Sequence, residues 1–234
     1  MEKLELLYEG KAKKVYKTEI DDKVIVEFKD DATAFDGEKK GQIKGKGEIN
    51  TEITATLFKH LEANGVETHL EEQLSEIDLL VKKVEIIPLE VVVRNIAAGS
   101  LAKRLGLEEG TKLAHPIVEF YYKDDDLGDP LLTEAHIEVE NIASKKEVAK
   151  LKELGLKINQ ILSDYLAQRE VKLVDFKLEF GKDGQGKIYL ADEISPDTSR
   201  LWDLKTDKKL DKDRFRRDLG DLEAAYKEIL KRLT

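Results

Sequence analysis

The segment LVDFKLEFG, residues 173–181, alternates apolar and charged side chains with a period of two. This period predicts a β-strand that turns its apolar side chains toward a core. The opposite face carries Asp175, Lys177 and Glu179, spaced roughly 6 to 7 Å apart along the strand. Such a face is either the solvent-exposed side of an antiparallel sheet or the floor of a binding site, and the strand alone leaves both interpretations open.

A β-hairpin is predicted to follow, because Asp183-Gly184-Gln185-Gly186 has the composition of a turn and IYLAD has the pattern of a second strand. If the loop comprises residues 184–187, Glu179 lies directly opposite Asp192, with Cβ atoms roughly 4.5 to 5.5 Å apart. Two facing carboxylates repel each other unless a cation lies between them, and Mg²⁺ carrying nucleotide phosphates suits such a site. The alternative is an exposed hairpin end whose two side chains point into water.

Near the N-terminus, YEGKAKKVY places Lys11 and Lys13 just after a turn at Gly10. Backbone N–H groups of such a turn, together with an ammonium group, can bind a polyphosphate. The segment matches neither of the common glycine-rich nucleotide motifs. Taken alone, these residues therefore favour a solvent-exposed lysine turn over a phosphate site.

In PLEVVVRNIAAGSLAKRLG, Arg94 ends an apolar run, and Ser100 is expected to cap the N-terminus of a short helix. A guanidinium beside a helix N-terminus can bind phosphate or carboxylate. A structural ion pair beside a helix cap would explain the same residues. Arg200, in the polar loop SPDTSRLWD just after Asp192, favours a site for an anionic small molecule.

Composition narrows the class of protein. The 234 residues carry a formal net charge of −9, which argues against a general binder of nucleic acid or of anionic membranes. There is no cysteine and no apolar stretch long enough to span a membrane, so we expect a cytoplasmic protein without disulfides or cysteine-bound zinc.

Strand patterns come first, mixed elements follow and helices come last, which predicts an α+β fold with a smaller N-terminal lobe. Helices are expected over residues 46–65, over 144–168 with a Ser144/Glu147 capping box, and over 211–233. The polar segment 28–47, which contains Asp36, is expected to be a loop that could close over a site. A plain surface loop is the alternative.

Four segments together resemble the SAICAR synthetase family: LYEGKAKKVY, IIPLEVVVRNIAAGS, LVDFKLEFG and DEISPDTSRLWD. The resemblance runs nearly end to end, and Ser199 stands where many members have cysteine. It implies a two-lobed α+β fold related to ATP-grasp enzymes and kinases. The β-rich N-terminal lobe would comprise residues 1–87 and bind the nucleotide, and the larger mixed lobe would comprise residues 88–234 and bind the ribotide and metal.

The resemblance also implies a reaction. An ATP-dependent ligase of purine biosynthesis would join L-aspartate to 5-amino-1-(5-phosphoribosyl)imidazole-4-carboxylate, with Mg²⁺ as cofactor, and would form a homodimer. The alternatives are another ATP-dependent carboxylate ligase or a small-molecule kinase on the same scaffold, or a nucleotide-binding module without catalysis.

The resemblance assigns residues to each part of this reaction. ATP would be bound by Gly10, Lys11, Ala12, Lys13, Val15, Val81, Lys82, Val84 and Ile86, with the segment 81–86 at the adenine. Mg²⁺ would be bound by Glu179 and Asp192. The ribotide would be bound by Arg94, Ser100, Asp175, Lys177 and Arg200. Lys177 would neutralise the reacting carboxylate, and Asp175 would orient the ribotide or accept a proton from the incoming amine. Weaker candidates for closure and aspartate binding are Asp36, Lys123 and Asp129.

Overall fold

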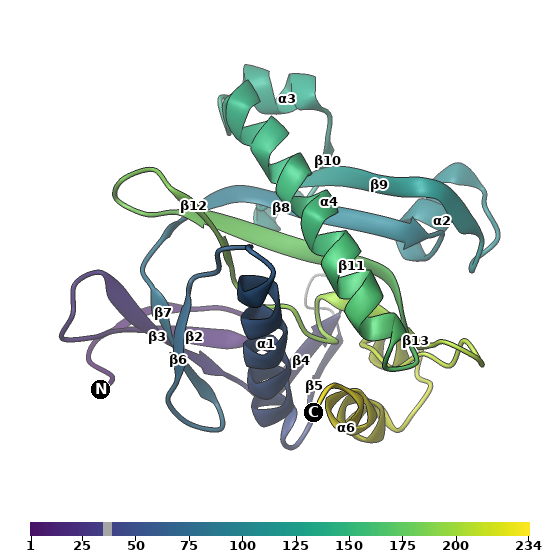
Figure 1. Ribbon diagram of the computed structural model, residues 1–234, viewed down its shortest axis with the longest axis horizontal. Helices are drawn as coiled ribbons and strands as arrows, with labels where there is room; N and C mark the ends of the chain where they lie inside the picture. Colours follow the sequence, from purple (N-terminus) through teal and green to yellow (C-terminus); the bar gives the residue numbers. More distant parts are fainter. Residues whose placement is uncertain (35–38) are drawn as a thin grey trace.

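The alternating segments of the first third of the chain form an antiparallel sheet (Figure 1). The computed structural model describes residues 1–34 and 39–234, and in it this sheet has the strand order β1-β2-β3-β7-β6. Its strands are β1 (Leu6–Glu9), β2 (Lys13–Lys17), β3 (Lys23–Phe28), β6 (Leu70–Gln73) and β7 (Asp78–Lys82). Helix α1 (Lys46–Ala63) packs against β3, β6 and β7.

Helix α1 confirms the helix predicted over residues 46–65, in which apolar residues recur every four positions. Ile49, Ile53, Leu57 and Leu61 are all buried, so the apolar stripe faces the core. The helix ends as expected, because Gly65 adopts a φ of 72° that non-glycine residues rarely accept.

A second antiparallel sheet has the strand order β10-β9-β8-β11-β12, with β13 paired to β11. Its strands are β8 (Glu85–Ile96), β9 (Lys112–Tyr122), β10 (Leu131–Leu132), β11 (Val171–Lys182), β12 (Ile188–Ala191) and β13 (Ser199–Asp203). The short helices α2 (Gly99–Leu105), η1 (Asp125–Leu127) and α3 (Glu134–Val139) lie in its connections.

The long helix α4 (Lys145–Ala167) lies across β8 and β11 and covers one face of this sheet (Figure 1). Ser144 and Glu147 form the predicted capping box at its start. Gly155 allows the close approach, since an added Cβ would lie only 3.3 Å from Val93 and 3.4 Å from Val91. The opposite face of the sheet is therefore left for the charged side chains of β11.

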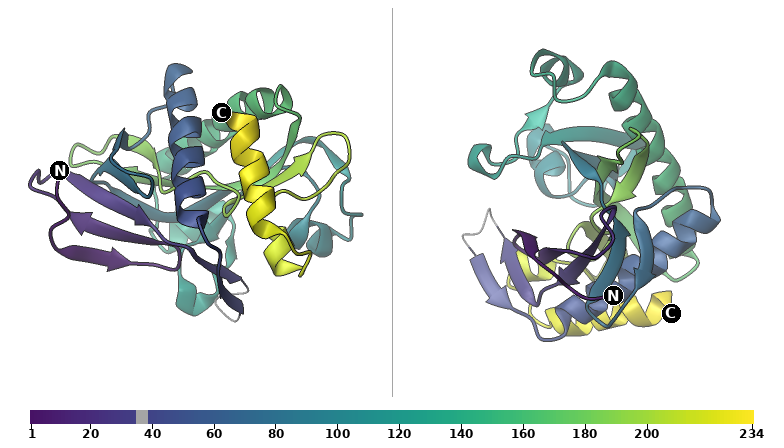
Figure 2. Two further views of the ribbon diagram at one scale, coloured as in Figure 1. Left: turned by 90° about the horizontal axis from the view of Figure 1, so that it is seen from below. Right: turned by 90° about the vertical axis from the view of Figure 1, so that its left-hand side faces the viewer.

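The C-terminal segment differs from the prediction of one helix over residues 211–233. It forms α5 (Asp213–Arg216) and α6 (Leu222–Leu233). Asp218, Gly220 and Asp221 between them have φ values of 53°, 67° and 45°, which break the helical path. Because of this break, α6 can pack beside α1 (Figure 2, left).

The segment 28–47 is also more ordered than a plain loop. Strands β4 (Asp31–Ala34) and β5 (Lys39–Gln42) form a hairpin, and Asp36 lies outside the described residues. The fold is a mixed α+β fold, as predicted. The expected boundary between residues 87 and 88 falls within the continuous strand β8, and the division into two lobes stays a prediction. No helix in the described part of the chain is long and apolar enough to cross a membrane.

Candidate active site

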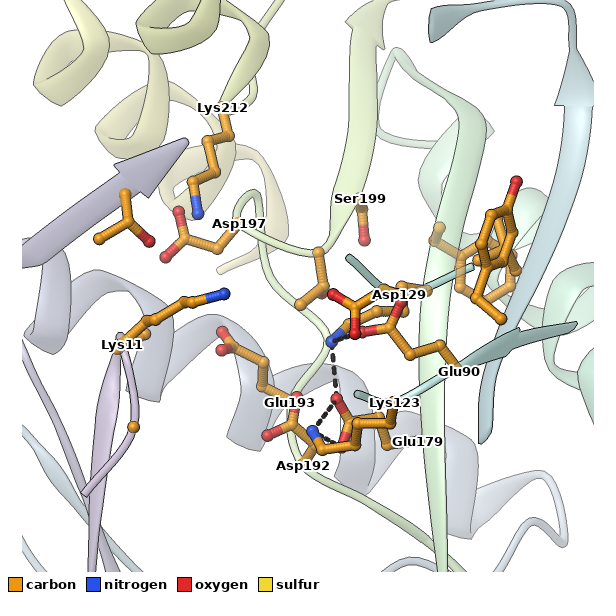
Figure 3. A pocket seen from close by; sticks show the side chains of 18 of the residues that line it. Lys11, Glu90, Lys123, Asp129, Glu179, Asp192, Glu193, Asp197, Ser199 and Lys212 are labelled. Carbon is orange, nitrogen blue, oxygen red and sulfur yellow. Dashed lines mark hydrogen bonds and ion pairs between the residues drawn. The ribbon is translucent and has the colours of Figure 1, made fainter. Parts of the chain in front are cut away.

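A cavity of about 1000 Å³ is lined by the β1–β2 turn, the uncovered face of β8 and β11, and the segment between β12 and β13 (Figure 3). Thirteen of the predicted site residues line it: Gly10, Lys11, Ala12, Lys13, Arg94, Ser100, Lys123, Asp129, Asp175, Lys177, Glu179, Asp192 and Arg200. The other residues predicted to bind ATP lie outside this lining: Val15 and, from the predicted adenine segment, Val81, Lys82, Val84 and Ile86.

The charged face of β11 is the floor of this cavity. Asp175 and Glu179 are only 3% and 2% exposed, so this face is not the solvent-exposed side of a sheet. Strand β8 lies next to β11, with Arg94 opposite Asp175 and Glu90 opposite Glu179. Both strands therefore contribute side chains to the same floor.

Arg94, Asp175 and Arg200 form one row across β8, β11 and β13. Nη1 of Arg94 donates to Oδ2 of Asp175 at 2.8 Å, and Nη1 of Arg200 donates to both Asp175 oxygens at 3.0 and 2.9 Å. Burial alone would lower the pKa of each arginine. The Asp175 carboxylate, together with Glu119 beside Arg94 and Asp213 beside Arg200, outweighs burial and raises both pKa values. The row therefore holds two permanent positive charges in fixed positions at the cavity.

Further side chains fix the two guanidinium groups. Nε of Arg94 donates to Glu119 at 2.7 Å, and Nη2 of Arg94 donates to the Tyr121 hydroxyl at 3.0 Å. Nε of Arg200 donates to Asp213 at 2.9 Å. These partners limit the rotation of both planes, which favours recognition of a planar or tetrahedral anion in one orientation.

Ser100 lies beside Arg94, but the prediction that it is a helix N-cap is wrong. Helix α2 begins one residue earlier, at Gly99, and its capping residue Ala98 makes no side-chain cap. Gly99 has a φ of 53°, and a Cβ there would clash with the guanidinium of Arg200. This close approach places Ser100 in the first turn, where its hydroxyl accepts a hydrogen bond from Arg94 Nη2 at 3.2 Å.

Lys177 joins the acidic residues of the floor. Its ammonium donates to Glu90 at 2.9 Å and to Glu179 at 2.6 Å. Burial opposes the charged form, but Glu179, Glu90 and Asp192 together raise the pKa of Lys177 well above its usual value. Lys123, from the segment after β9, donates to both oxygens of Glu179 at 2.7 and 2.6 Å.

The hairpin register differs by one residue from the prediction. Glu179 pairs with Ala191 rather than with Asp192. The loop is one residue longer at its start, because the Asp183 carboxylate accepts hydrogen bonds from the backbone N–H groups of Gln185 and Lys187, both at 2.9 Å. The expected direct opposition of Glu179 and Asp192 is therefore wrong.

Asp192 nevertheless reaches the same cavity as Glu179 (Figure 3). Side chains alternate along a strand, so a continued β12 would turn Asp192 away from the face of Ala191. Asp192 instead has a φ of 60°, a left-handed conformation that aspartate tolerates, and this redirects its carboxylate.

Lys13 binds Asp192 and also Glu193, the latter at 2.9 Å. Burial alone would raise the pKa of Asp192, but Lys13, Lys177 and Lys123 outweigh burial and lower it. Burial alone would lower the pKa of Lys13, but the Asp192 and Glu193 carboxylates outweigh burial and raise it. Both groups are therefore charged at neutral pH, and the β1–β2 turn is tied to the end of β12.

The β1–β2 turn lies at the cavity, as predicted. The Gly10 N–H donates to the Lys13 carbonyl at 2.9 Å, and the Lys11 ammonium donates to Asp125 at 2.8 Å. Val81 is buried in the core at β7, whereas Val84 lies against Gly181 of β11. Whether residues 81–86 contact adenine stays a prediction.

Eight charged lining residues were not predicted from the sequence: Glu9, Asp31, Glu90, Asp125, Glu193, Asp197, Lys212 and Arg216. Glu90 could have been found, because it shares a face with Arg94 at the even positions of one strand. Glu193 and Asp197 lie within DEISPDTSRLWD, one of the segments that carry the resemblance, and this segment could have indicated them. Lys212 lies outside all four of those segments. Among the described residues, no group of three or more acidic or histidine side chains forms a metal site by itself.

Comparisons with known proteins agree with these observations. The family model described as SAICAR synthetase matches residues 6–233. A phosphoribosylaminoimidazole-succinocarboxamide synthase of Bacillus cereus (strain AH187) is 65% identical over 233 residues, covering 100% of this chain and 98% of the relative.

Solved structures agree as well. The phosphoribosylaminoimidazole-succinocarboxamide synthase of Ehrlichia chaffeensis has a TM-score of 0.96 at 48% identity, with 98% of each chain covered. A SAICAR synthetase in complex with ADP has a TM-score of 0.95 at 57% identity, with 97% of each chain covered. The family match extends over nearly the whole chain and includes every segment that lines the cavity, so this chain belongs to the SAICAR synthetase family.

Proposed function

We propose that this chain joins L-aspartate to 5-amino-1-(5-phosphoribosyl)imidazole-4-carboxylate at the expense of ATP, through an acyl phosphate. The products are the succinocarboxamide, ADP and phosphate. The observation that carries the proposal is the row Arg94–Asp175–Arg200 beside Lys177 on the floor of one cavity. Together with the family membership, this row offers fixed cations to an anionic ribotide.

The chemistry explains why ATP is needed. A carboxylate resists attack by an amine, because its charge is delocalised and an oxide is a poor leaving group. Transfer of the γ-phosphoryl group to one carboxylate oxygen gives an acyl phosphate, and the amine then displaces phosphate to form the amide. Such transfer depends on positioning and on charge neutralisation rather than on a protein nucleophile.

The ribotide is bound at the row of arginines. Arg94, Arg200 and Ser100 bind its phosphate, and Lys177 neutralises its imidazole carboxylate. Both oxygens of Asp175 already accept arginine N–H groups. This supports an orienting role for Asp175, which holds the two guanidinium planes in the geometry that the ribotide meets.

ATP is bound at the β1–β2 turn, with Gly10, Lys11, Ala12 and Lys13 at its phosphates. The resemblance places the segment 81–86 at the adenine and assigns Val15 to ATP binding. A relative solved in complex with ADP, 57% identical to this chain, supports nucleotide binding. We propose the two-lobed arrangement shared with ATP-grasp enzymes and kinases, with the nucleotide between the lobes.

The residues present fit Mg²⁺. Glu179 and Asp192 supply hard oxygen donors, and each already attracts ammonium groups, so the site favours positive charge between them. Two carboxylates suffice for an ion that is held mainly by nucleotide phosphates and water. When bound, Mg²⁺ would neutralise charge on the transferred phosphoryl group.

An isotope experiment tests the proposal. The ribotide is labelled with ¹⁸O in its carboxylate and incubated with Mg-ATP and L-aspartate. We expect one ¹⁸O atom in each inorganic phosphate released, because the acyl phosphate loses its bridging oxygen with phosphate. Consumption of ATP without aspartate and without an amide product would indicate a kinase and would refute the proposal.

Two weaker expectations rest on the resemblance and on composition. We propose that the chain forms a homodimer and acts in the cytoplasm. Sedimentation equilibrium measures the first, and a single species at 26.6 kDa would refute it.

A further inference from the structure

Lys212 differs from the other cations around the cavity. Side chains that line the cavity and pair with a carboxylate include Lys13, Lys123, Lys177, Arg94 and Arg200. The ammonium of Lys212 has no hydrogen bond or ion pair within residues 1–34 and 39–234, although it points toward Asp197 and the cavity (Figure 3). Burial lowers the pKa of Lys212, which indicates a positive charge without full compensation.

Asp197 attracts Lys212 but compensates its charge only in part, because the Asp197 carboxylate is already hydrogen-bonded to other side chains. Lys46 donates to Oδ2 at 2.6 Å, and both side chains are almost completely buried. Asn50 donates to the same oxygen at 3.1 Å, and the Tyr226 hydroxyl donates to Oδ1 at 2.7 Å. Lys46 thus neutralises Asp197, and Lys212 adds a net positive charge to this wall of the cavity.

Arg216 adds a second cation at the same wall. Its backbone N–H donates to the Lys212 carbonyl at 3.0 Å, so the two residues are one helical turn apart. Both side chains line the cavity. Nη1 of Arg216 donates to Asp213 at 2.6 Å, while its Nη2 and Nε have no acceptor in the described part of the chain.

We propose that Lys212 and Arg216 bind a carboxylate of L-aspartate. This inference rests on the proposed function. The reaction needs sites for three anions, and the ATP phosphates and the ribotide are assigned to the β1–β2 turn and to the arginine row. The Lys212/Arg216 wall is a cationic part of the same cavity that those two assignments leave unused. A dicarboxylate placed there enters the cavity in which the acyl phosphate forms.

Substitution of Lys212 tests the inference. Lys212→Met keeps the length of the side chain and removes its charge. We expect the KM for L-aspartate to rise roughly 10- to 100-fold, the range for loss of a hydrogen bond between charged groups. The kcat at saturating aspartate should change only a few-fold. The dissociation constants of ADP and of the ribotide, measured by calorimetry, should stay within about twofold of the wild-type values.

Matched variants separate binding from structure. Lys212→Arg keeps a positive charge and should recover most of the affinity for aspartate. Lys208→Met removes an exposed lysine outside the cavity that pairs with Glu228, and it should leave every constant unchanged. If Lys212→Met does not fold, Arg216→Gln should show the same selective rise in the KM for aspartate.

Three outcomes would overturn the inference. One is an unchanged KM for aspartate in both Lys212→Met and Arg216→Gln. Another is an equal weakening of ADP or ribotide binding, which would assign the wall to those ligands. A third is a loss of product inhibition by inorganic phosphate with an unchanged KM for aspartate, which would make the wall a phosphate site. Failure of the proposed function is distinct, because the wild-type protein would then form no amide.

Discussion

At Asp192 a half-buried carboxylate and an unusual backbone conformation occur in one residue. Its φ of 60° turns the side chain into the cavity, and lysines keep it charged. Asparagine tolerates the same conformation, so Asp192→Asn removes the charge without forcing the backbone to move. Lys13 would keep its pairing with Glu193 at 2.9 Å.

We therefore expect Asp192→Asn to reduce kcat by at least about 100-fold, as loss of a metal-binding charge would, with a melting temperature within a few degrees of wild type. Steady-state kinetics and calorimetry measure the two effects. Asp207→Asn is a matched control, because Asp207 also has a positive φ of 58° but lies outside the cavity lining. A large loss of stability with normal turnover would instead make Asp192 a structural residue.

Asp211 predicts how stability depends on pH. Burial, reinforced by Asp213, raises its pKa to about 7, whereas an aspartate in the unfolded chain titrates near 3.9. Between these values the folded state binds more protons than the unfolded state. The contribution of Asp211 to the free energy of unfolding is therefore largest in acid and is lost as pH rises toward 7.

Asp211→Asn cannot ionise and should lose this dependence. The two oxygens of Asp211 accept the backbone N–H groups of Leu201 and Asp213, and a carboxamide keeps only one of these acceptors. The variant is therefore less stable than wild type at pH 5. We expect the difference to shrink by on the order of 2 kcal/mol between pH 5 and 8. Urea titrations across this range measure it, and a difference independent of pH would contradict the assignment.

At the scale of elements, α4 is set by local sequence. The Ser144 hydroxyl accepts from the Glu147 N–H at 3.3 Å, and Glu147 accepts from the Ser144 N–H at 2.7 Å. Ser144→Ala removes one side of this capping box. We expect a loss of about 1 kcal/mol in the free energy of unfolding and unchanged kinetic constants, since Ser144 is outside the cavity lining. A reduced turnover with the stability of wild type would show that α4 influences β8 and β11, the strands that form the floor of the cavity.

The sequence predicted the elements whose signals are local. The α1 stripe, the α4 cap and the alternation in β11 all depend on residues within a few positions of each other. The hairpin register was missed because the Asp183 side chain hydrogen-bonds the backbone of its own loop and lengthens it by one residue. The prediction of one continuous helix over residues 211–233 failed because Asp218 and Asp221 adopt positive φ values that the apolar period does not reveal.

Parts of the site that depend on distant partners could not be predicted. Lys46 and Asp197 are 151 positions apart, and neither has a motif around it that indicates the other. Glu119 accepts a hydrogen bond from Arg94 across β8 and β9, which are paired only in the folded chain. The family motifs contain most of the residues that we assign to the substrates, whereas partners such as Lys46 and Glu119 emerged only from the packing.

At the scale of the molecule, Asp197 joins three distant parts of the chain. Lys46 comes from the start of α1, Tyr226 from the C-terminal helix α6, and Asp197 itself from the segment between β12 and β13. The Tyr226 ring is completely buried, and burial together with Asp197 raises the pKa of its hydroxyl, so it remains a donor. The position of α6 is thereby coupled to the Lys212/Arg216 wall.

Tyr226→Phe tests this coupling, because it removes one hydroxyl and keeps the packing of the ring. We expect a loss of roughly 1.5 to 3 kcal/mol in the free energy of unfolding, the value of a hydrogen bond to a charged group. The less restrained Asp197 should also raise the KM for L-aspartate a few-fold, while ADP binding stays unchanged. Tyr165→Phe is the matched control. The Tyr165 hydroxyl donates to the Leu233 carbonyl of the same helix, whereas the Tyr226 hydroxyl donates to Asp197, which lines the cavity. If both variants lose similar stability and only Tyr226→Phe changes the KM for L-aspartate, the C-terminal helix supports the substrate site through Asp197. Equal KM values in the two variants would limit α6 to a structural role.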